Sequence, residues 1–188
     1  MVASNSTNPA ASMSSNIEDT GTPLEMQLGT VFRRNCIELI RPATGKSSAI
    51  SLLVQALARE EQLDRQHAGK IICQLIERER HSSSAIGKGL AFPHLRTKDV
   101  SQFVGAIGVA PEGIHFGSLD KQPTQLVFLT LTPWENREQH VALLSRLVRL
   151  MQDKAVNLQM AQGLRPQGVY DYLMDLGDPA SASAAGGP

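Results

Sequence analysis

The chain has 188 residues, of which 41% are hydrophobic, and its 18 Lys and Arg residues balance its 18 Asp and Glu residues. A formal net charge of zero argues against binding to nucleic acid, because nucleic-acid-binding proteins usually have clusters of basic residues. It also argues against electrostatic binding to anionic membranes. No apolar run approaches the ~20 residues that a membrane-spanning helix needs, so we expect no direct membrane insertion. The N-terminus does not show the cationic start followed by an apolar core that is typical of a secretory signal, so we expect a cytoplasmic protein.

Composition divides the chain into one domain and two tails. Residues 1–25 are rich in Ser, Asn, Thr and Ala, and residues 178–188 are mostly small, so neither end has enough large apolar groups to offset its ordering entropy. We therefore expect disordered tails at 1–25 and 178–188 around a domain at 26–177. The two cysteines, Cys36 and Cys73, lie in apolar contexts and are expected to be buried thiols of a reducing compartment.

The sequence of the first half of the domain predicts a strand and two helices. Residues 36–40 form a short apolar run that indicates a strand, and turn-forming residues follow it. A helical face comes next, with apolar residues at i, i+3, i+4 and i+7: Ile50, Leu53, Val54 and Leu57. Asp64 is the predicted N-cap of a second helix, whose apolar side carries Ala68, Ile71, Ile72 and Leu75.

The second half predicts three buried strands and then helices. Short apolar runs at 86–92, 103–109 and 125–131 indicate the strands, and residues 110–113 and 119–123 have the composition of turns. A helix over 137–151 is expected to be capped by Asn136 with Gln139, and shorter helices follow at 153–162 and 166–174. The predicted fold class is α/β, with a mixed β-sheet flanked by helices.

His94 is the first candidate for chemistry. It follows Pro93, which fixes its own φ angle and holds the residue before it extended, so the chain should present the imidazole from a constrained strand end. Near pH 7 a histidine is partly neutral and can act as a nucleophile or a ligand.

His140 is the second candidate, and two interpretations are open. It lies in the first turn of the helix predicted at 137–151, on the face that carries Leu143, Leu144, Leu147 and Met151. Taken alone, it is best explained as a satisfied, partly buried histidine. A helix N-terminus also suits an anion, so two facing imidazoles there would form a phosphate pocket.

Arg78 and Ser84 are candidate phosphate-binding residues. Arg78 ends the second helix and leads into the serine turn before the His94 strand, and a guanidinium can bind phosphate oxygens through two parallel hydrogen bonds. Ser84 offers a hydroxyl at the start of that strand, although a turn hydroxyl bonded to its own backbone is an equal alternative. The neighbouring Glu79 and Arg80 are expected to be solvated charges at a helix end.

Two other motifs do not support a site. Gly45-Lys46-Ser47 resembles the end of a phosphate-binding loop, but the glycine required five residues earlier is Ile40. His67, His81 and His115 lack the short spacings of zinc ligands, so we expect no metal. A histidine-built metal hydrolase remains an alternative that would need a third converging ligand.

Several short segments form a recognisable pattern in chain order: Arg78-Glu79, Ser83-Ser84-Ala85-Ile86-Gly87-Lys88-Gly89, Pro93-His94, Gly113-Ile114-x-Phe116, Asp120, Pro123, Val127-Phe128 and His140-Val141-x-Leu143-Leu144. Together they resemble the fructose/mannitol-type enzyme IIA domain of the bacterial phosphoenolpyruvate-dependent sugar phosphotransferase system, a family that includes the nitrogen-regulatory enzyme IIA. The resemblance runs over residues 32–175. Departures from the family pattern include Ala85 for a usual glycine and Lys88 for a common asparagine.

The resemblance implies a fold and a role for each candidate residue. It implies a single enzyme IIA type-2 domain in which His94 takes a phosphoryl group from the carrier protein HPr and passes it to a cysteine of an enzyme IIB. His140 would orient the site, Arg78 would bind the phosphoryl oxygens, and Ser84 stands where a threonine or serine is usual. Transfer between histidines keeps the group at similar energy, so no cofactor is expected.

Two further expectations concern partners. A regulator is the alternative to sugar transport: the same phosphorylation would then control binding to a target protein. Around the pocket, Phe92 and Leu95 are the apolar residues expected to contact HPr.

Overall fold

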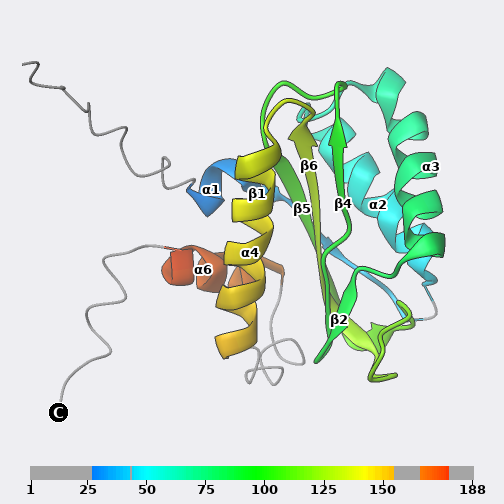
Figure 1. Ribbon diagram of the computed structural model, residues 1–188. Coiled ribbons are helices and arrows are strands. Elements are labelled where there is room, and N and C mark those ends of the chain that lie inside the picture. The colour runs from blue at the N-terminus through cyan, green and yellow to red at the C-terminus, as the bar shows by residue number, and fades with distance from the viewer. Residues whose placement is uncertain (1–26, 43, 155–165, 178–188) are drawn as a thin grey trace, which may run out of the picture.

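The computed structural model describes residues 27–42, 44–154 and 166–177. The tails predicted at 1–25 and 178–188, and most of the helix predicted at 153–162, lie outside the described residues. The described part contains one six-stranded sheet with helices on both faces (Figure 1). This arrangement confirms the predicted α/β class.

The sheet is mixed, and its longest strands lie at its centre. Its strands are β1 (Phe32–Leu39), β2 (Ala85–Gly87), β3 (Leu90–Ala91), β4 (His94–Thr97), β5 (Val104–Ile114) and β6 (Thr124–Pro133). The order is β1-β5-β6-β3-β2, and β4 also pairs with β6. Strand β6 runs antiparallel to β5 and parallel to both β3 and β4. Therefore β3 and β4 follow one another along the same side of β6.

The helices form one layer on each face of the sheet. One layer consists of α2 (Lys46–Arg59) and α3 (Arg65–His81). The other consists of α1 (Leu28–Val31), α4 (Arg137–Lys154) and α6 (Pro166–Gly177). Figure 1 shows α3 and α4 on opposite sides of the strands β4 and β6. Side chains from both helical layers can therefore reach the region around β4.

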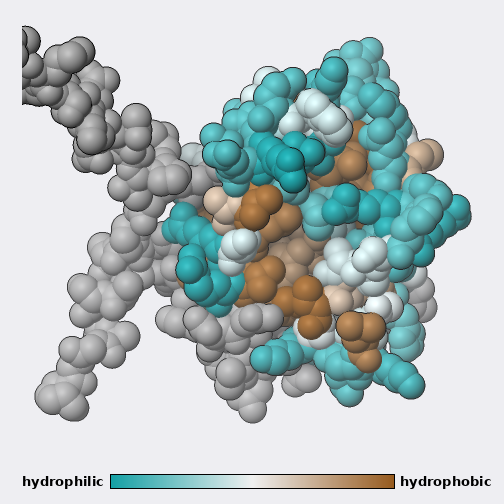
Figure 2. All heavy atoms as spheres, in the orientation of Figure 1, coloured by the Kyte–Doolittle hydropathy of each residue, from teal (hydrophilic) through white to brown (hydrophobic). Residues whose placement is uncertain are grey.

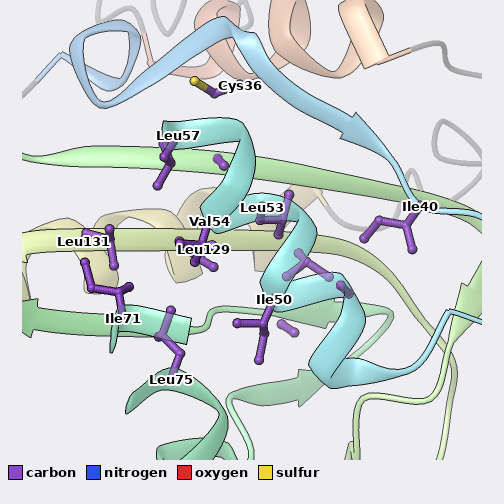
Figure 3. Packing of buried hydrophobic residues seen from close by; sticks show 14 of the residues in the cluster. Cys36, Ile40, Ile50, Leu53, Val54, Leu57, Ile71, Leu75, Leu129 and Leu131 are labelled. Atoms are coloured by element: carbon purple, nitrogen blue, oxygen red, sulfur yellow. The ribbon is translucent and has the colours of Figure 1, made fainter. Parts of the chain in front are cut away.

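The core beneath α2 and α3 confirms the predicted helical faces. Figure 3 shows the α2 side chains Ile50, Leu53, Val54 and Leu57 pointing at the sheet, together with Ile71 and Leu75 of α3. Each of these side chains is fully buried, which stabilises the fold by about 1.5–3 kcal/mol per residue. Asp64 caps α3 as predicted, because its carboxylate accepts a hydrogen bond from the backbone N–H of Gln66 at 3.0 Å.

The opposite core is built around aromatic rings. Phe128 of β6 stacks on Phe92 with ring centroids 5.4 Å apart, and it meets the edge of Phe32 at 6.0 Å. Phe92 is only 3% exposed. The expectation that Phe92 contacts HPr is therefore wrong, because the ring is committed to the core.

The strand predicted at 86–92 is instead a hairpin. Gly87, Lys88 and Gly89 all have positive φ angles, of 90°, 54° and 74°, and these reverse the chain between β2 and β3. A Cβ on Gly87 would lie 2.7 Å from a carboxylate oxygen of Asp120, so the position also needs the space that glycine leaves. His94 consequently begins a new strand, β4, which the apolar pattern did not predict.

Two other expectations need correction. Residues 110–113, predicted as a turn, continue strand β5 as far as Ile114, with a register shift opposite β6. Cys36 is buried as predicted, and burial raises the pKa of its thiol to about 11. Cys73, in contrast, is exposed on α3.

Candidate functional site

The backbone around Pro93 sets the position of His94. Proline has no N–H to donate, and the strand pairing along β6 is interrupted there, between β3 and β4. The carbonyl of Pro93 nevertheless accepts a hydrogen bond from the N–H of Thr130 at 3.0 Å, and His94 pairs in register with Thr130. The imidazole is therefore held on a sheet strand with β6 beside it.

The two ring nitrogens of His94 have different partners. Nδ1 lies 2.8 Å from the carbonyl oxygen of Phe92, which can only accept, so Nδ1 carries the proton and donates it. Nε2 lies 2.7 Å from Nη2 of Arg78, which can only donate, so Nε2 presents its lone pair. Burial lowers the pKa of His94, the Phe92 hydrogen bond opposes this in part, and the charge of Arg78 lowers it further. The ring is therefore neutral at pH 7, with Nε2 as its nucleophilic atom.

His140 lies beside His94, near the start of α4. The two ring centroids are 5.3 Å apart and the ring planes are inclined by 53°. His140 is 8% exposed, and its Nδ1 lies 2.8 Å from the hydroxyl oxygen of Thr132. Burial, and then the nearby His94, Arg96 and Arg78, lower the pKa of His140 to about 4. This ring is also neutral at pH 7.

Glu79 holds the loop that leads from α3 toward His94. Both of its carboxylate oxygens lie 3.1 Å from the backbone N–H of Ser84, which donates to them, and one lies 3.4 Å from Nζ of Lys46. Lys46 also donates to the backbone carbonyl of Glu79 at 3.2 Å. Glu79 is 5% exposed, so the expectation of a solvated charge is wrong for this residue. Its buried carboxylate joins α2, α3 and the turn before β2.

A cavity of about 880 Å³ lies beside Arg78 and His94. Its lining also includes Cys73, Gln74, Glu77 and His81 of α3, the serines at 82–84, and Leu95. Arg78 and Ser84 thus line the same cavity as His94, and His140 lies next to His94 without being one of the lining residues. The Ser84 hydroxyl is buried and has no hydrogen-bonding partner within the described part of the chain.

Partly exposed apolar side chains lie on the elements next to the two histidines. Trp134 is 49% exposed, and the guanidinium carbon of Arg96 lies 4.8 Å from the centre of its ring. Val141 is exposed near the start of α4, and Leu95 is half-buried beside His94. Figure 2 shows hydrophobic residues gathered in the middle of one face, bordered by hydrophilic ones.

The arrangement suits the binding and transfer of a compact anion. A neutral imidazole lone pair, a guanidinium and a second neutral imidazole converge from three different elements. Over the described ranges, no group of three or more His, Cys, Asp or Glu residues could hold a metal ion. None of the helices in those ranges is long and apolar enough to cross a bilayer.

Comparison with known proteins agrees with this geometry. Residues 30–175 match the family model described as phosphoenolpyruvate-dependent sugar phosphotransferase system, EIIA 2. The chain belongs to this family. The fructose-specific EIIA component of Haloferax volcanii is 30% identical over 149 residues, which are 79% of this chain and 96% of that protein. The nitrogen regulatory protein of Bradyrhizobium diazoefficiens is 29% identical over 136 residues, or 72% and 89% of the two chains.

Solved structures of EIIA proteins share the fold. The nitrogen regulatory protein IIA-Ntr of Neisseria meningitidis has a TM-score of 0.67 at 23% identity, covering 80% of this chain and 99% of that one. The mannitol enzyme IIA of Escherichia coli, in its complex with phosphorylated enzyme IIB, has a TM-score of 0.60 at 20% identity, covering 78% and 98%. The fold predicted as a single EIIA type-2 domain is thereby confirmed.

The structure brings three of the four candidate residues together, and the sequence did not reveal the residues that hold them in place. Arg78, His94 and His140 are in contact or adjacent, as predicted, and Ser84 shares the cavity wall. Glu79 could have been found, because it follows the buried Ile71 and Leu75 at the same four-residue step along α3. For Thr132, nothing in the sequence marks the contact with His140, since it depends on the packing of α4 on β6.

Proposed function

We propose that this EIIA domain is a phosphohistidine phosphocarrier, in which His94 accepts a phosphoryl group from an HPr-like protein and passes it to an enzyme IIB. The observation that carries the proposal is the Arg78–His94–His140 group. His94 has its proton fixed on Nδ1, which leaves the Nε2 lone pair beside a guanidinium at a cavity wall.

Acceptance of the group follows from this tautomer. The Nε2 lone pair attacks the phosphorus of the donor phosphohistidine in line, the new N–P bond forms, and the old N–P bond breaks with its electron pair returning to the donor imidazole. The ring that carries the phosphoryl group gains positive character, and the hydrogen bond from Nδ1 to Phe92 O stabilises it. No proton has to leave His94 in this step.

Arg78 changes its partner during the reaction. In the free protein its guanidinium donates to the Nε2 lone pair, so this bond must be given up when Nε2 attacks. The guanidinium can then donate to two oxygens of the arriving phosphoryl group, whose charge it neutralises. Donation from the Ser84 hydroxyl to the phosphoryl group would give this buried hydroxyl a partner, which it lacks among the described residues. Delivery to an enzyme IIB cysteine is the same displacement in the opposite direction, with a thiolate as the nucleophile.

A regulatory role is the second candidate, and the relatives support it. The curated relatives include a fructose-specific EIIA component at 30% identity and a nitrogen regulatory protein at 29% identity. Both roles use the same phosphorylated histidine, and they differ in what the two forms of the protein bind. Affinity capture with phosphorylated and unphosphorylated protein separates them: an enzyme IIB partner favours transport, and a target bound by only one form favours regulation.

Labelling with phosphoenolpyruvate, enzyme I and HPr tests the proposal. The wild-type chain should take up one phosphoryl group, and His94→Ala should take up none. The matched control is His81→Ala, because His81 lines the same cavity but bonds only to Glu77 of its own helix within the described residues. Undiminished labelling of His94→Ala, or loss of labelling in His81→Ala alone, would reject the assignment of His94.

A further inference from the structure

Thr132 is a fully buried residue of β6 whose hydroxyl lies 2.8 Å from Nδ1 of His140. Among the described residues, this is the one hydrogen bond that the Thr132 side chain makes. The strand and the helix that carry the two residues are joined by only a few residues, so the contact closes the corner between β6 and α4.

The buried hydroxyl determines where the proton of His140 lies. A neutral imidazole carries one N–H, on either Nδ1 or Nε2. If Nδ1 carried it, Thr132 would have to accept, and its own hydroxyl proton would then be buried without an acceptor, which is costly. If Thr132 donates instead, both groups are satisfied and the proton of His140 lies on Nε2.

We propose that Thr132 is a positioning residue that fixes His140 as the Nε2–H tautomer and so supplies a neutral hydrogen-bond donor to the phosphoryl group on His94. The second half of this inference rests on the proposed function; the tautomer does not. The two rings are then complementary: His94 carries its proton on Nδ1 and its lone pair on Nε2, and His140 has the opposite arrangement. His94 can then act as the nucleophile, while His140 donates a hydrogen bond.

The same strand offers a matched control. Thr130 precedes Thr132 by two residues on β6, is also fully buried, and its hydroxyl has no hydrogen-bonding partner among the described residues. Replacing either threonine by valine keeps the volume nearly constant and removes one buried hydroxyl. Only the change at Thr132 removes a bond to His140.

Long-range ¹H–¹⁵N NMR of the uniformly ¹⁵N-labelled full chain at pH 7.5 reads the tautomer directly, with the His140 signals assigned by their loss in His140→Gln. Wild type, Thr132→Ser and Thr130→Val should show His140 protonated on Nε2, whereas Thr132→Val should show a mixture that includes Nδ1–H. A wild-type ring protonated on Nδ1, or an unchanged tautomer in Thr132→Val, would overturn the inference.

Single-turnover transfer from phosphorylated HPr tests the consequence. Thr132→Val should lower the transfer rate about tenfold, while the half-saturating donor concentration stays unchanged and Thr132→Ser restores the rate. An equal loss in Thr130→Val, or a full rate in Thr132→Val despite a changed tautomer, would overturn the positioning role. Failure of the wild-type chain to accept phosphate would reject the proposed function, whereas the NMR result would still decide the tautomer.

Discussion

The low pKa of His140 makes the stability of the fold depend on pH in a defined direction. The pKa of this ring falls from 6.5 to about 4 on folding, because the ring is buried and positive groups surround it. The unfolded chain therefore binds the proton more tightly than the folded one. Stability contributed by this residue is fully present above pH 6.5 and is lost as the pH falls toward 4.

The size of the effect follows from the same two values. Between pH 7 and pH 5, proton linkage at this one ring should lower the free energy of unfolding by about 2 kcal/mol. In His140→Gln this contribution is absent, because an amide does not titrate. His94 has a lowered pKa of the same sign, but wild type and variant both retain it.

Urea unfolding at pH 7 and pH 5 measures the difference. We expect wild type to lose about 2 kcal/mol more than His140→Gln between the two pH values, which corresponds to a difference of about 1 M in the shift of the urea midpoint. His81→Gln is the matched control, since the side chain of His81 is 74% exposed and should leave the wild-type pH dependence in place. If wild type and His140→Gln lose stability equally, the burial argument for His140 is refuted.

Three further predictions concern the neighbours of the two histidines. Glu79→Gln should lower the free energy of unfolding by about 1–3 kcal/mol, because it weakens the buried, charge-assisted hydrogen bonds of this side chain. The control Glu77→Gln, at an exposed position on the same helix, should change it by less than about 0.5 kcal/mol. Equal effects in chemical denaturation would show that the Glu79 contacts are unimportant. Arg78→Ala should reduce the single-turnover rate of phosphoryl acceptance about 100-fold, and an unchanged rate would remove the guanidinium from the mechanism. Trp134→Ala should raise the half-saturating concentration of HPr several-fold, because an exposed aromatic side chain beside the site is a candidate contact. Leu39→Ala should leave this concentration unchanged, because Leu39 is similarly exposed but lies on the outer strand β1. Equal effects of the two changes would argue against docking at Trp134.

Local patterns were sufficient for much of the fold. The four apolar residues of α2 were assigned to one face because helical spacing alone aligns them, and all four are buried. The cap at Asp64 was equally local, since its partner is two residues away. The strands at 103–109 and 125–131 were predicted because central strands are apolar on both faces.

Features that depend on distant partners were missed. Strand β4 contains His94 and Arg96, so its four residues have no apolar pattern, and it forms because β6 continues beside it. A charge at a helix end is usually solvated, which favours an exposed Glu79, but its buried carboxylate is paired with Lys46 from another helix and accepts from the backbone N–H of Ser84. The sequence marks the break between β2 and β3 with Gly87 and Gly89, but the apolar residues on both sides of them favour one continuous strand.

The sequence was enough to predict that the candidate site residues lie together, but not how they are hydrogen-bonded. Proline before histidine, an arginine at a helix end and a histidine in a first turn are visible in the sequence. Which nitrogen of His94 carries the lone pair depends on the carbonyl of Phe92, and the proton position on His140 depends on Thr132. These contacts arise only when the chain is folded.

The most direct test of the central claim is the position of the phosphoryl group on the phosphorylated full chain. ³¹P and ¹H–¹⁵N NMR of ¹⁵N-labelled protein, phosphorylated through HPr, should show a single phosphoramidate with phosphorus bonded to Nε2 of His94. Phosphate on Nδ1 of His94, or on any other residue, would contradict the mechanism built on this tautomer.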